Sequence, residues 1–244
     1  MHLKQSIHRA GGLLLQLVRS GLFRPHCRIC GCDLVRYEES VLCQGCRQKI
    51  RPAAENRCRV CGKFIPDGMA DCGSCLLEPP PFGQHRSYAA YEGTLRETII
   101  LFKYGEIEPL KHLLAGLYLE IIARELPGPY DAVVPVPGDR RRRRDFQPLR
   151  TAGQALARRL HAPFRPGLLV KKKSTPPQVG LTQAQRRANL DGAFALGRGA
   201  SASGLHVLLV DDVITTGTTL RQCAAVLRRG GARVTALTLA QARF

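Results

Sequence analysis

The segment that says most about chemistry lies near the C-terminus, where an apolar run, Leu208–Val210, leads into two adjacent carboxylates and a hydroxyl-rich loop. If a helix begins after that loop, the backbone N–H groups of its first turn and the threonine hydroxyls surround an anion. A glycine in the loop lets the backbone approach the anion closely. The segment therefore predicts a phosphate site made of Thr215, Thr216, Gly217, Thr218 and Thr219, beside Asp211 and Asp212.

The two carboxylates have a different task from the loop, because a carboxylate placed against a phosphate repels it. Carboxylate oxygens accept hydrogen bonds from hydroxyl groups such as those of a sugar diol. Placing the acids at the strand end and the donors in the loop separates the two tasks. The alternative, a plain strand–helix turn with an aspartate cap, leaves the acid pair and the threonines unexplained.

The cysteines are the second source of chemistry: the chain has ten, and eight of them form four Cys-x-x-Cys pairs. Disulfide frameworks rarely repeat this spacing, whereas zinc knuckles require it. Pairing in sequence order predicts two closed, structural four-thiolate Zn²⁺ sites, while interleaved pairing and iron–sulfur clusters remain alternatives. The predicted ligands are Cys27, Cys30, Cys43 and Cys46 in the first site and Cys58, Cys61, Cys72 and Cys75 in the second.

Two cysteines are left over. Cys32 could replace a neighbour in the first site, although its spacing from Cys30 is less favourable, and Cys223 reads as a small buried residue of a helix. No stretch reads as a secretory signal or as a membrane span of about 20 apolar residues. Since thiolates free to bind metal fit a reducing compartment, we expect a cytoplasmic protein.

The chain is strongly basic, with 37 Lys and Arg against 19 Asp and Glu and a formal net charge of +18. Such a surface favours nucleic acid, phosphorylated metabolites or an acidic membrane face. Basic runs occur at Arg140–Arg144, Lys171–Lys173 and Arg186-Arg187. With 6% aromatic residues and no Trp, an extensive base-stacking platform is not indicated. A groove for single-stranded phosphates is therefore one reading of the charge, and a solvated surface is the other.

Apolar periodicity predicts strands that alternate with helices in the second part of the chain, which favours an α/β fold with a mostly parallel, twisted sheet and helices on both faces. Ligands of such sheets bind outside the carboxyl ends of the strands. The predicted strands are Tyr88–Tyr91, Ala132–Val136, Leu205–Val210 and Arg233–Leu239, and the predicted helices Leu95–Tyr104, Leu110–Glu125, Leu149–Leu160 and Leu220–Arg229.

Composition divides the chain into four segments. Residues 1–26 read as a basic amphipathic helix, and residues 27–78 hold eight cysteines but few large apolar side chains, so that metal must hold this small module together. A proline-rich linker is predicted over 79–87, and the α/β domain over 88–244.

These motifs together resemble the ComF family, in which zinc ribbons precede a type I phosphoribosyltransferase fold. Asp211–Thr219 is similar to the signature of that fold for phosphoribosyl pyrophosphate (PRPP), and Tyr130–Pro137 to its pyrophosphate strand. Phe102–Tyr104 resembles the Lys-Tyr element of ComF proteins, and Gln178–Phe194 their mobile loop. The resemblance extends from about residue 20 to 240.

The resemblance implies a role for each matched residue. Asp211 and Asp212 would hold the ribose 2- and 3-hydroxyls, the threonine loop the 5-phosphate, and Mg²⁺ would accompany PRPP. It also implies partners, namely single-stranded DNA and the competence proteins of natural transformation. The remaining positions are Lys103 at the leaving group, Pro135, Val136, Pro137, Arg140 and Arg144 at the pyrophosphate, and Gln178, Arg186 and Asn189 in the mobile loop.

The chain departs from the family pattern after the pyrophosphate strand. ComF proteins read Pro-Leu-His where this chain has Pro137-Gly-Asp139, and Arg-Gly-Phe-Asn-Gln where it has Arg144–Pro148. The two added acids weaken anion binding there, and Arg140–Arg144 offset them. Two hypotheses follow: a protein that binds PRPP and transfers its phosphoribosyl group, or a non-catalytic protein of the competence machinery that binds single-stranded DNA or acts as a scaffold.

Overall fold

The computed structural model describes residues 25–34, 41–138, 147–173 and 189–243. The predicted helix over 1–26 therefore lies almost wholly outside the described residues, as do Arg140, Arg144, Gln178 and Arg186. The chain divides into two compact units, Met1–Ile50 and Arg51–Phe244. The second cysteine tetrad thus belongs to the same unit as the sheet.

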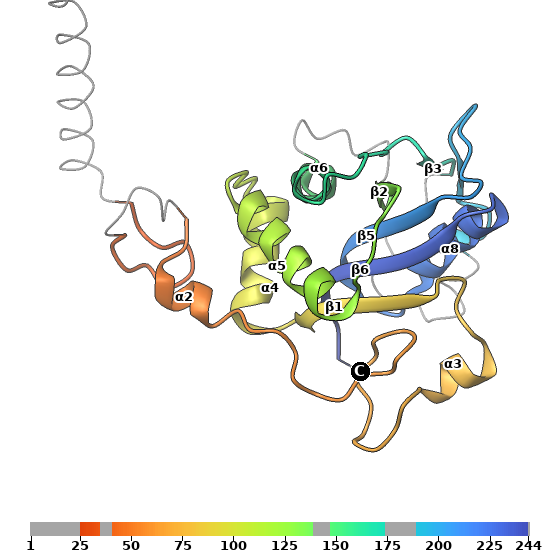
Figure 1. Cartoon of the computed structure of the whole chain (residues 1–244). Helices are drawn as coiled ribbons and strands as arrows, with labels where there is room; N and C mark the ends of the chain where they lie inside the picture. The colour runs from red at the N-terminus through yellow and green to blue at the C-terminus, as the bar shows by residue number, and fades with distance from the viewer. Residues whose placement is uncertain (1–24, 35–40, 139–146, 174–188, 244) are drawn as a thin grey trace, which may run out of the picture. The chain divides into compact units, whose positions relative to one another are not determined.

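A four-stranded parallel sheet forms the centre of the second unit (Figure 1). Its long apolar runs are buried, as expected for parallel strands covered on both faces. Because all neighbours are parallel, the carboxyl ends of the strands meet at one edge. The order is β1 (Gln84–Ala90), β6 (Arg233–Gln241), β5 (His206–Ile214) and β2 (Ala132–Pro135).

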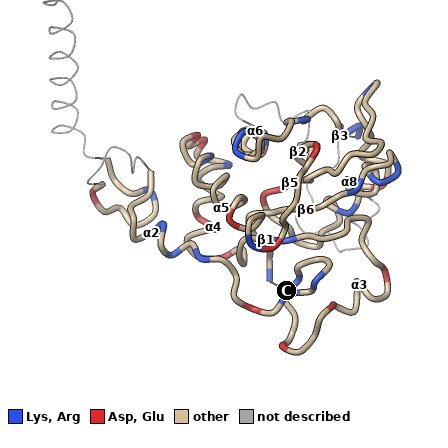
Figure 2. The backbone as a smooth tube through the Cα atoms, in the orientation of Figure 1, with Lys and Arg blue, Asp and Glu red and all other residues tan. Residues whose placement is uncertain are grey.

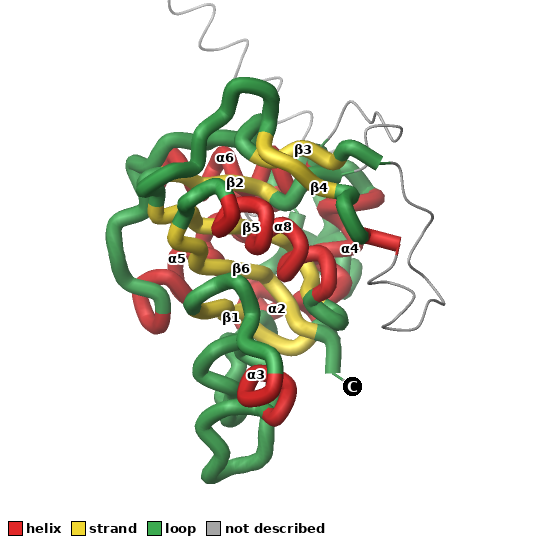
Figure 3. The backbone as a smooth tube through the Cα atoms, turned by 90° about the vertical axis from the view of Figure 1, so that its right-hand side faces the viewer, coloured by secondary structure: helices red, strands yellow, loops and turns green. Residues whose placement is uncertain are grey.

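Helices cover both faces of this sheet (Figures 1 and 3). The helix α8 (Thr218–Arg229) packs on one face, where Val207 and Leu209 of β5 share an apolar cluster with Leu220 and Leu227 of α8. The alternate strand residues point to the other face. That face carries α4 (Gly93–Tyr104), α5 (Leu110–Glu125) and α6 (Pro148–Arg159). The predicted α/β class, a mostly parallel sheet with helices on both faces, is confirmed.

Several element boundaries differ from the prediction. The strand β1 begins at Gln84 rather than Tyr88, so that the end of the predicted linker lies in the sheet. The strand β5 continues to Ile214 instead of ending at Val210, because its pairing with β6 runs on past the two acids. A small antiparallel pair was also missed, β3 (Leu169–Lys171) with β4 (Phe194–Leu196), and it includes the first residue of the basic run Lys171–Lys173.

Each cysteine tetrad is built on a short hairpin and one helical turn. The helix α2 (Gln44–Gln48) carries Cys46 in the first ribbon, and α3 (Gly73–Leu77) carries Cys75 in the second. Among the helices of the described ranges, none has the length and apolar character needed to cross a bilayer.

Candidate functional site

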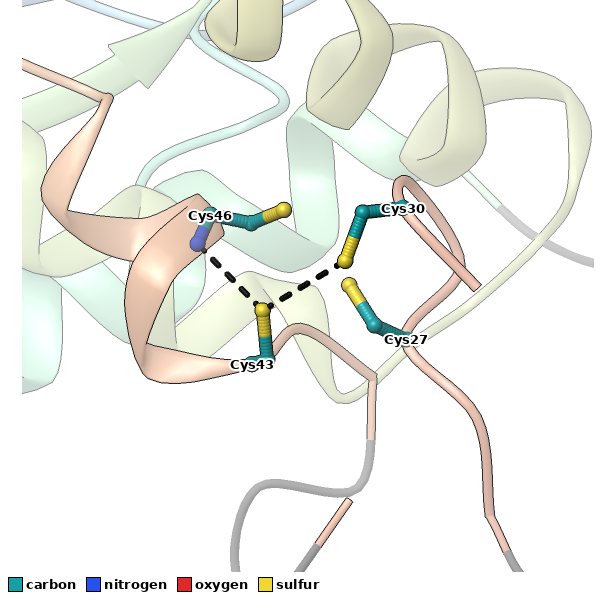
Figure 4. A group of neighbouring side chains, drawn as sticks. All are labelled: Cys27, Cys30, Cys43 and Cys46. Carbon is teal, nitrogen blue, oxygen red and sulfur yellow. Dashed lines mark hydrogen bonds between the residues drawn. The ribbon is translucent and has the colours of Figure 1, made fainter. Parts of the chain in front are cut away.

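The cysteines gather into two tetrads in sequence order, as predicted. Within each tetrad the four sulfurs lie within 4.8 Å of one another. Figure 4 shows the first tetrad, in which the Sγ atoms of Cys30 and Cys43 are 3.6 Å apart; those of Cys61 and Cys72 are also 3.6 Å apart. Four thiolates around one Zn²⁺ give sulfur–sulfur edges of about 3.8 Å, so both tetrads fit that ion.

The second ribbon is joined to the strand β1 by hydrogen bonds. The His85 amide donates to the Val60 carbonyl at 2.8 Å, and the His85 Nδ1–H donates to the Cys61 carbonyl at 2.7 Å. Burial lowers the pKa of His85 to about 4, so the ring is neutral. Its Nε2 therefore accepts from the Thr238 hydroxyl at 3.0 Å. This turn also needs Gly62, whose φ is +68° and whose missing Cβ would lie 2.8 Å from the His85 carbonyl oxygen.

A buried group of charges strengthens the same junction. Glu125 of α5 accepts from Arg57 Nη2 at 2.6 Å and from Arg86 Nε at 2.8 Å. Arg86 also donates to the carbonyls of Arg59 and Cys58, at 2.9 and 3.4 Å. One carboxylate thus holds two arginines that bind the knuckle of the second ribbon to the sheet.

The loop between β5 and α8 has the form expected of a phosphate site. Gly217 has a φ of +75°, in the left-handed region that favours glycine, and α8 begins at Thr218. The Thr216 and Thr218 hydroxyls are 3.0 Å apart. The N–H groups of the first turn of α8 have no partner within the helix, so they and the hydroxyls can bind an anion.

The two acids lie inside the strand β5, and their side chains alternate between its faces. Asp212 is on the side of α4, where its carboxylate is 2.7 Å from Lys103 Nζ. Asp211 is on the side of α8, where burial, and after it the charge of Asp211, raises the pKa of the Cys223 thiol. Burial, followed by the charge of Asp212, raises the pKa of Asp211 to about 7.

The predicted pyrophosphate strand lies beside the acids. Pro135 of β2 is the register partner of Val210, and the Val136 amide donates to the Val210 carbonyl at 2.9 Å. Pro137 follows directly. The carboxyl end of β2 is thus next to the acid pair, which is the arrangement expected of one ligand site at this edge. Of the predicted mobile-loop positions, only Asn189 is described.

Comparison with known proteins agrees with this architecture. Residues 151–243 match the family described as phosphoribosyl transferase domain, and residues 18–76 match the double zinc ribbon domain. The DNA utilization protein YhgH of Escherichia coli strain K12 is 32% identical over 197 residues, covering 78% of this chain and 86% of that protein. Competence protein F of Haemophilus influenzae is 31% identical over 214 residues, covering 84% and 90%. The chain belongs to the ComF family.

Competence protein ComFC of Bacillus subtilis extends the comparison, with 26% identity over 220 residues, 84% of this chain and 86% of that protein. The resemblance to ComF proteins that the motifs predicted is thus confirmed, and with it the type I phosphoribosyltransferase fold.

The structure adds a feature that the sequence did not reveal: a cavity of about 390 Å³ beside the loop between β5 and α8. Thr216 and Thr218 line it from the loop, and Arg221 and Arg229 line it from α8. The opposite wall comes from the second ribbon, through Ser74 and the residues that follow α3. Arg221 Nη1 also donates to the Glu78 carbonyl at 3.3 Å. No local pattern signals this cavity, because its walls are far apart in the sequence.

Proposed function

We propose that this ComF-family protein binds the 5-phosphoribosyl group of PRPP at the carboxyl edge of β5. The observation that supports the proposal most is the order of parts at this edge: two acids, a glycine in the left-handed region, hydroxyls, and the start of a helix. The loop of Thr215–Thr219 would hold the 5-phosphate. Asp211 and Asp212 would hold the ribose hydroxyls.

The free site already carries a cation. Lys103 pairs with Asp212 at 2.7 Å and is partly buried. The charge of Asp212, followed by that of Asp211, raises the pKa of Lys103 against the opposing effect of burial. The charged Lys103 would meet the leaving pyrophosphate. The Mg²⁺ that accompanies PRPP would neutralise that pyrophosphate.

Whether the bound group is transferred depends on an acceptor and on the segment over 139–146, which lies outside the described residues. The transfer would displace pyrophosphate from C1 of the ribose through a cation-like transition state. The protein would contribute an ordered ribose and exclusion of water rather than a nucleophile.

Titration calorimetry with PRPP and Mg²⁺, then with ribose 5-phosphate and with pyrophosphate separately, tests the proposal. We expect binding of PRPP and of ribose 5-phosphate, and a loss of about a hundredfold in affinity in the Asp211→Asn/Asp212→Asn variant, since two charge-assisted hydrogen bonds are removed. Asp131→Asn, a change of the same type at the opposite edge of the sheet, serves as the control. Wild-type protein that binds pyrophosphate but not ribose 5-phosphate would contradict the assignment.

The site should also respond to pH. Because the pKa of Asp211 is about 7 in the free protein, this carboxyl is mostly protonated at pH 6 and mostly ionised at pH 8. If the ionised form accepts the ribose hydroxyl, affinity should rise about tenfold across this range. The stability of the free protein should change in the opposite direction. The folded protein favours the protonated form of Asp211, so the free energy of unfolding falls as the pH rises from about 4, the unfolded pKa, toward 7.

Four other titratable groups lie around Asp211 in the described residues. Asp212 adjoins it on β5, Lys103 faces the pair from α4, Tyr118 of α5 donates to the Asp211 carbonyl at 2.7 Å, and Cys223 faces it from α8. The ligand phosphate titrates near pH 6, and the Asp211→Asn variant retains that part of the dependence. Calorimetry at pH 6, 7 and 8 on both proteins isolates the contribution of Asp211. Equal profiles would rule it out.

A second candidate function is the handling of single-stranded DNA. The relatives named as DNA utilization and competence proteins favour it, as does the net charge of +18. Basic residues occur in the last turns of α6 and α8 (Figure 2). Salt-dependent binding of a labelled oligonucleotide that persists in the Asp211→Asn/Asp212→Asn variant would support this function separately from PRPP binding.

A further inference from the structure

The two zinc knuckles share their backbone hydrogen bonds, but the residue that ends each turn differs between them. The amide of Gly31 donates to the carbonyl of Cys27 at 2.9 Å, and Gly62 makes the same bond to Cys58. The first cysteine amide then donates to the carbonyl five residues later at 2.8 Å in both knuckles. That fifth residue is Cys32 in the first ribbon and Lys63 in the second.

Cys32 places a fifth thiol against the first tetrad. Its Sγ is 3.4 Å from that of Cys30, which is close to a sulfur–sulfur edge of a zinc site. Both Cys30 and Cys32 are exposed. In the second tetrad Cys58, Cys72 and Cys75 are buried, and the residue equivalent to Cys32 is a lysine, which is a cation.

We propose that Cys32 is an exchangeable ligand of the first zinc site, which can replace Cys30. Zinc in such a site is four-coordinate, so the fifth thiol substitutes for a ligand rather than adding to the four. One Zn–S bond forms at Cys32 and one breaks at Cys30, and the proton of the Cys32 thiol passes to the departing Cys30 thiolate. The ion stays bound and no oxidant is required.

The exchange gives the two ribbons different properties. The first site keeps its ion when the exposed Cys30 is modified or removed, because a thiol already lies at contact distance. Among the described residues, no fifth thiol lies beside the second tetrad. Three of its four ligands are buried, and its knuckle is hydrogen-bonded to β1. The first ribbon is therefore tolerant at one ligand, and the second depends on all of its four.

Metal content after dialysis tests this in equivalent variants. Cys30→Ser should keep both ions, whereas Cys61→Ser should lose the ion of the second site. Cys30→Ser/Cys32→Ser should lose the first ion. Its affinity for Zn²⁺ should be at least about tenfold lower than that of Cys30→Ser, roughly the effect of one contact in a zinc site. Replacing Zn²⁺ with Co²⁺ reports the same change through the intensity of the thiolate-to-metal absorption. This measurement requires no activity assay.

Exchanging the residues at positions 32 and 63 distinguishes ligand exchange from unfolding of the ribbon. Cys32 and Lys63 are both exposed, so Cys32→Lys and Lys63→Cys change little else. Adding Lys63→Cys to Cys61→Ser should restore the second ion, and adding Cys32→Lys to Cys30→Ser should remove the first. The proposal is contradicted if Cys30→Ser loses its ion as readily as Cys61→Ser. It is also contradicted if removing Cys32 from Cys30→Ser leaves the metal content unchanged.

Discussion

Cys58→Ser is expected to release zinc and to destabilise the whole unit Arg51–Phe244, whereas Cys27→Ser at the equivalent position should leave the sheet intact. The reason is the junction of the second ribbon with β1. His85 and Arg86 both donate to carbonyls of the knuckle, so the strand is ordered partly by a loop that metal holds. A structural zinc ion contributes about 10 kcal/mol or more to the folding of its module. Losing it therefore costs more than most single substitutions.

Thermal unfolding followed by circular dichroism, together with metal analysis, measures this difference. Cys58→Ser should lose one ion per chain and lower the unfolding temperature of the sheet by roughly 10 °C or more, because a loss of several kcal/mol shifts the midpoint by that amount in a unit of this size. Cys27→Ser belongs to the other compact unit and should change the unfolding of the sheet little. Equal effects of the two variants would show that the ribbons are not coupled to the sheet differently.

The same junction connects the second zinc site with the proposed ligand site. The second ribbon forms one wall of the cavity beside Thr216 and Thr218, and its Glu78 carbonyl accepts from Arg221 on α8. The helix α8, which follows the proposed phosphate loop, thus contacts the second ribbon directly. Cys58→Ser should for this reason also weaken ribose 5-phosphate binding, in the calorimetric assay above, while Cys27→Ser should not.

The parts of the site that the sequence predicted are those in which a local pattern determines the structure. The acid pair, the glycine and the threonines follow one another within nine residues that run from the end of β5 into the start of α8, Asp211–Thr219. The four Cys-x-x-Cys pairs were also predictable, since each pair is local in the sequence. The sequence left open which pairs share a site, and the structure brings them together in sequence order. The resemblance to ComF proteins then supplied the order of the zinc ribbons and the sheet.

What the sequence did not predict depends on contacts between distant residues. His85, Arg86 and Ser87 read as a polar linker, yet they are at most 8% exposed, because each finds a polar partner in the ribbon, the sheet or α5. Glu125 and Arg57 are separated by 68 residues. No periodicity reports such a pair. The length of β5 was missed for a similar reason: its last residues are strand only because β6 extends beside them.

Replacing Glu125 with Gln should be the most costly change at a site that binds neither zinc nor the ligand. The substitution keeps the shape of the side chain but leaves the guanidinium groups of Arg57 and Arg86 without their counter-charge, although both are largely buried, with side chains 11% and 10% exposed. Breaking a buried ion pair in this way costs about 3–5 kcal/mol. Glu108→Gln makes the same chemical change in an exposed pair with Lys111 and should cost less than about 1 kcal/mol.

Urea unfolding measures the loss of stability in both variants. The rate of zinc release gives a second test of the role of Glu125. Because Arg86 holds the carbonyls of Arg59 and Cys58 as well as the carboxylate, an Arg86 that has lost its partner should hold the knuckle less firmly. A chelator should then remove the second ion from Glu125→Gln several-fold faster than from the wild type, while removal of the first ion stays unchanged. If Glu125→Gln and Glu108→Gln cost the same, the carboxylate does not hold the ribbon to the sheet. The backbone bonds of His85 would then be sufficient to form that junction.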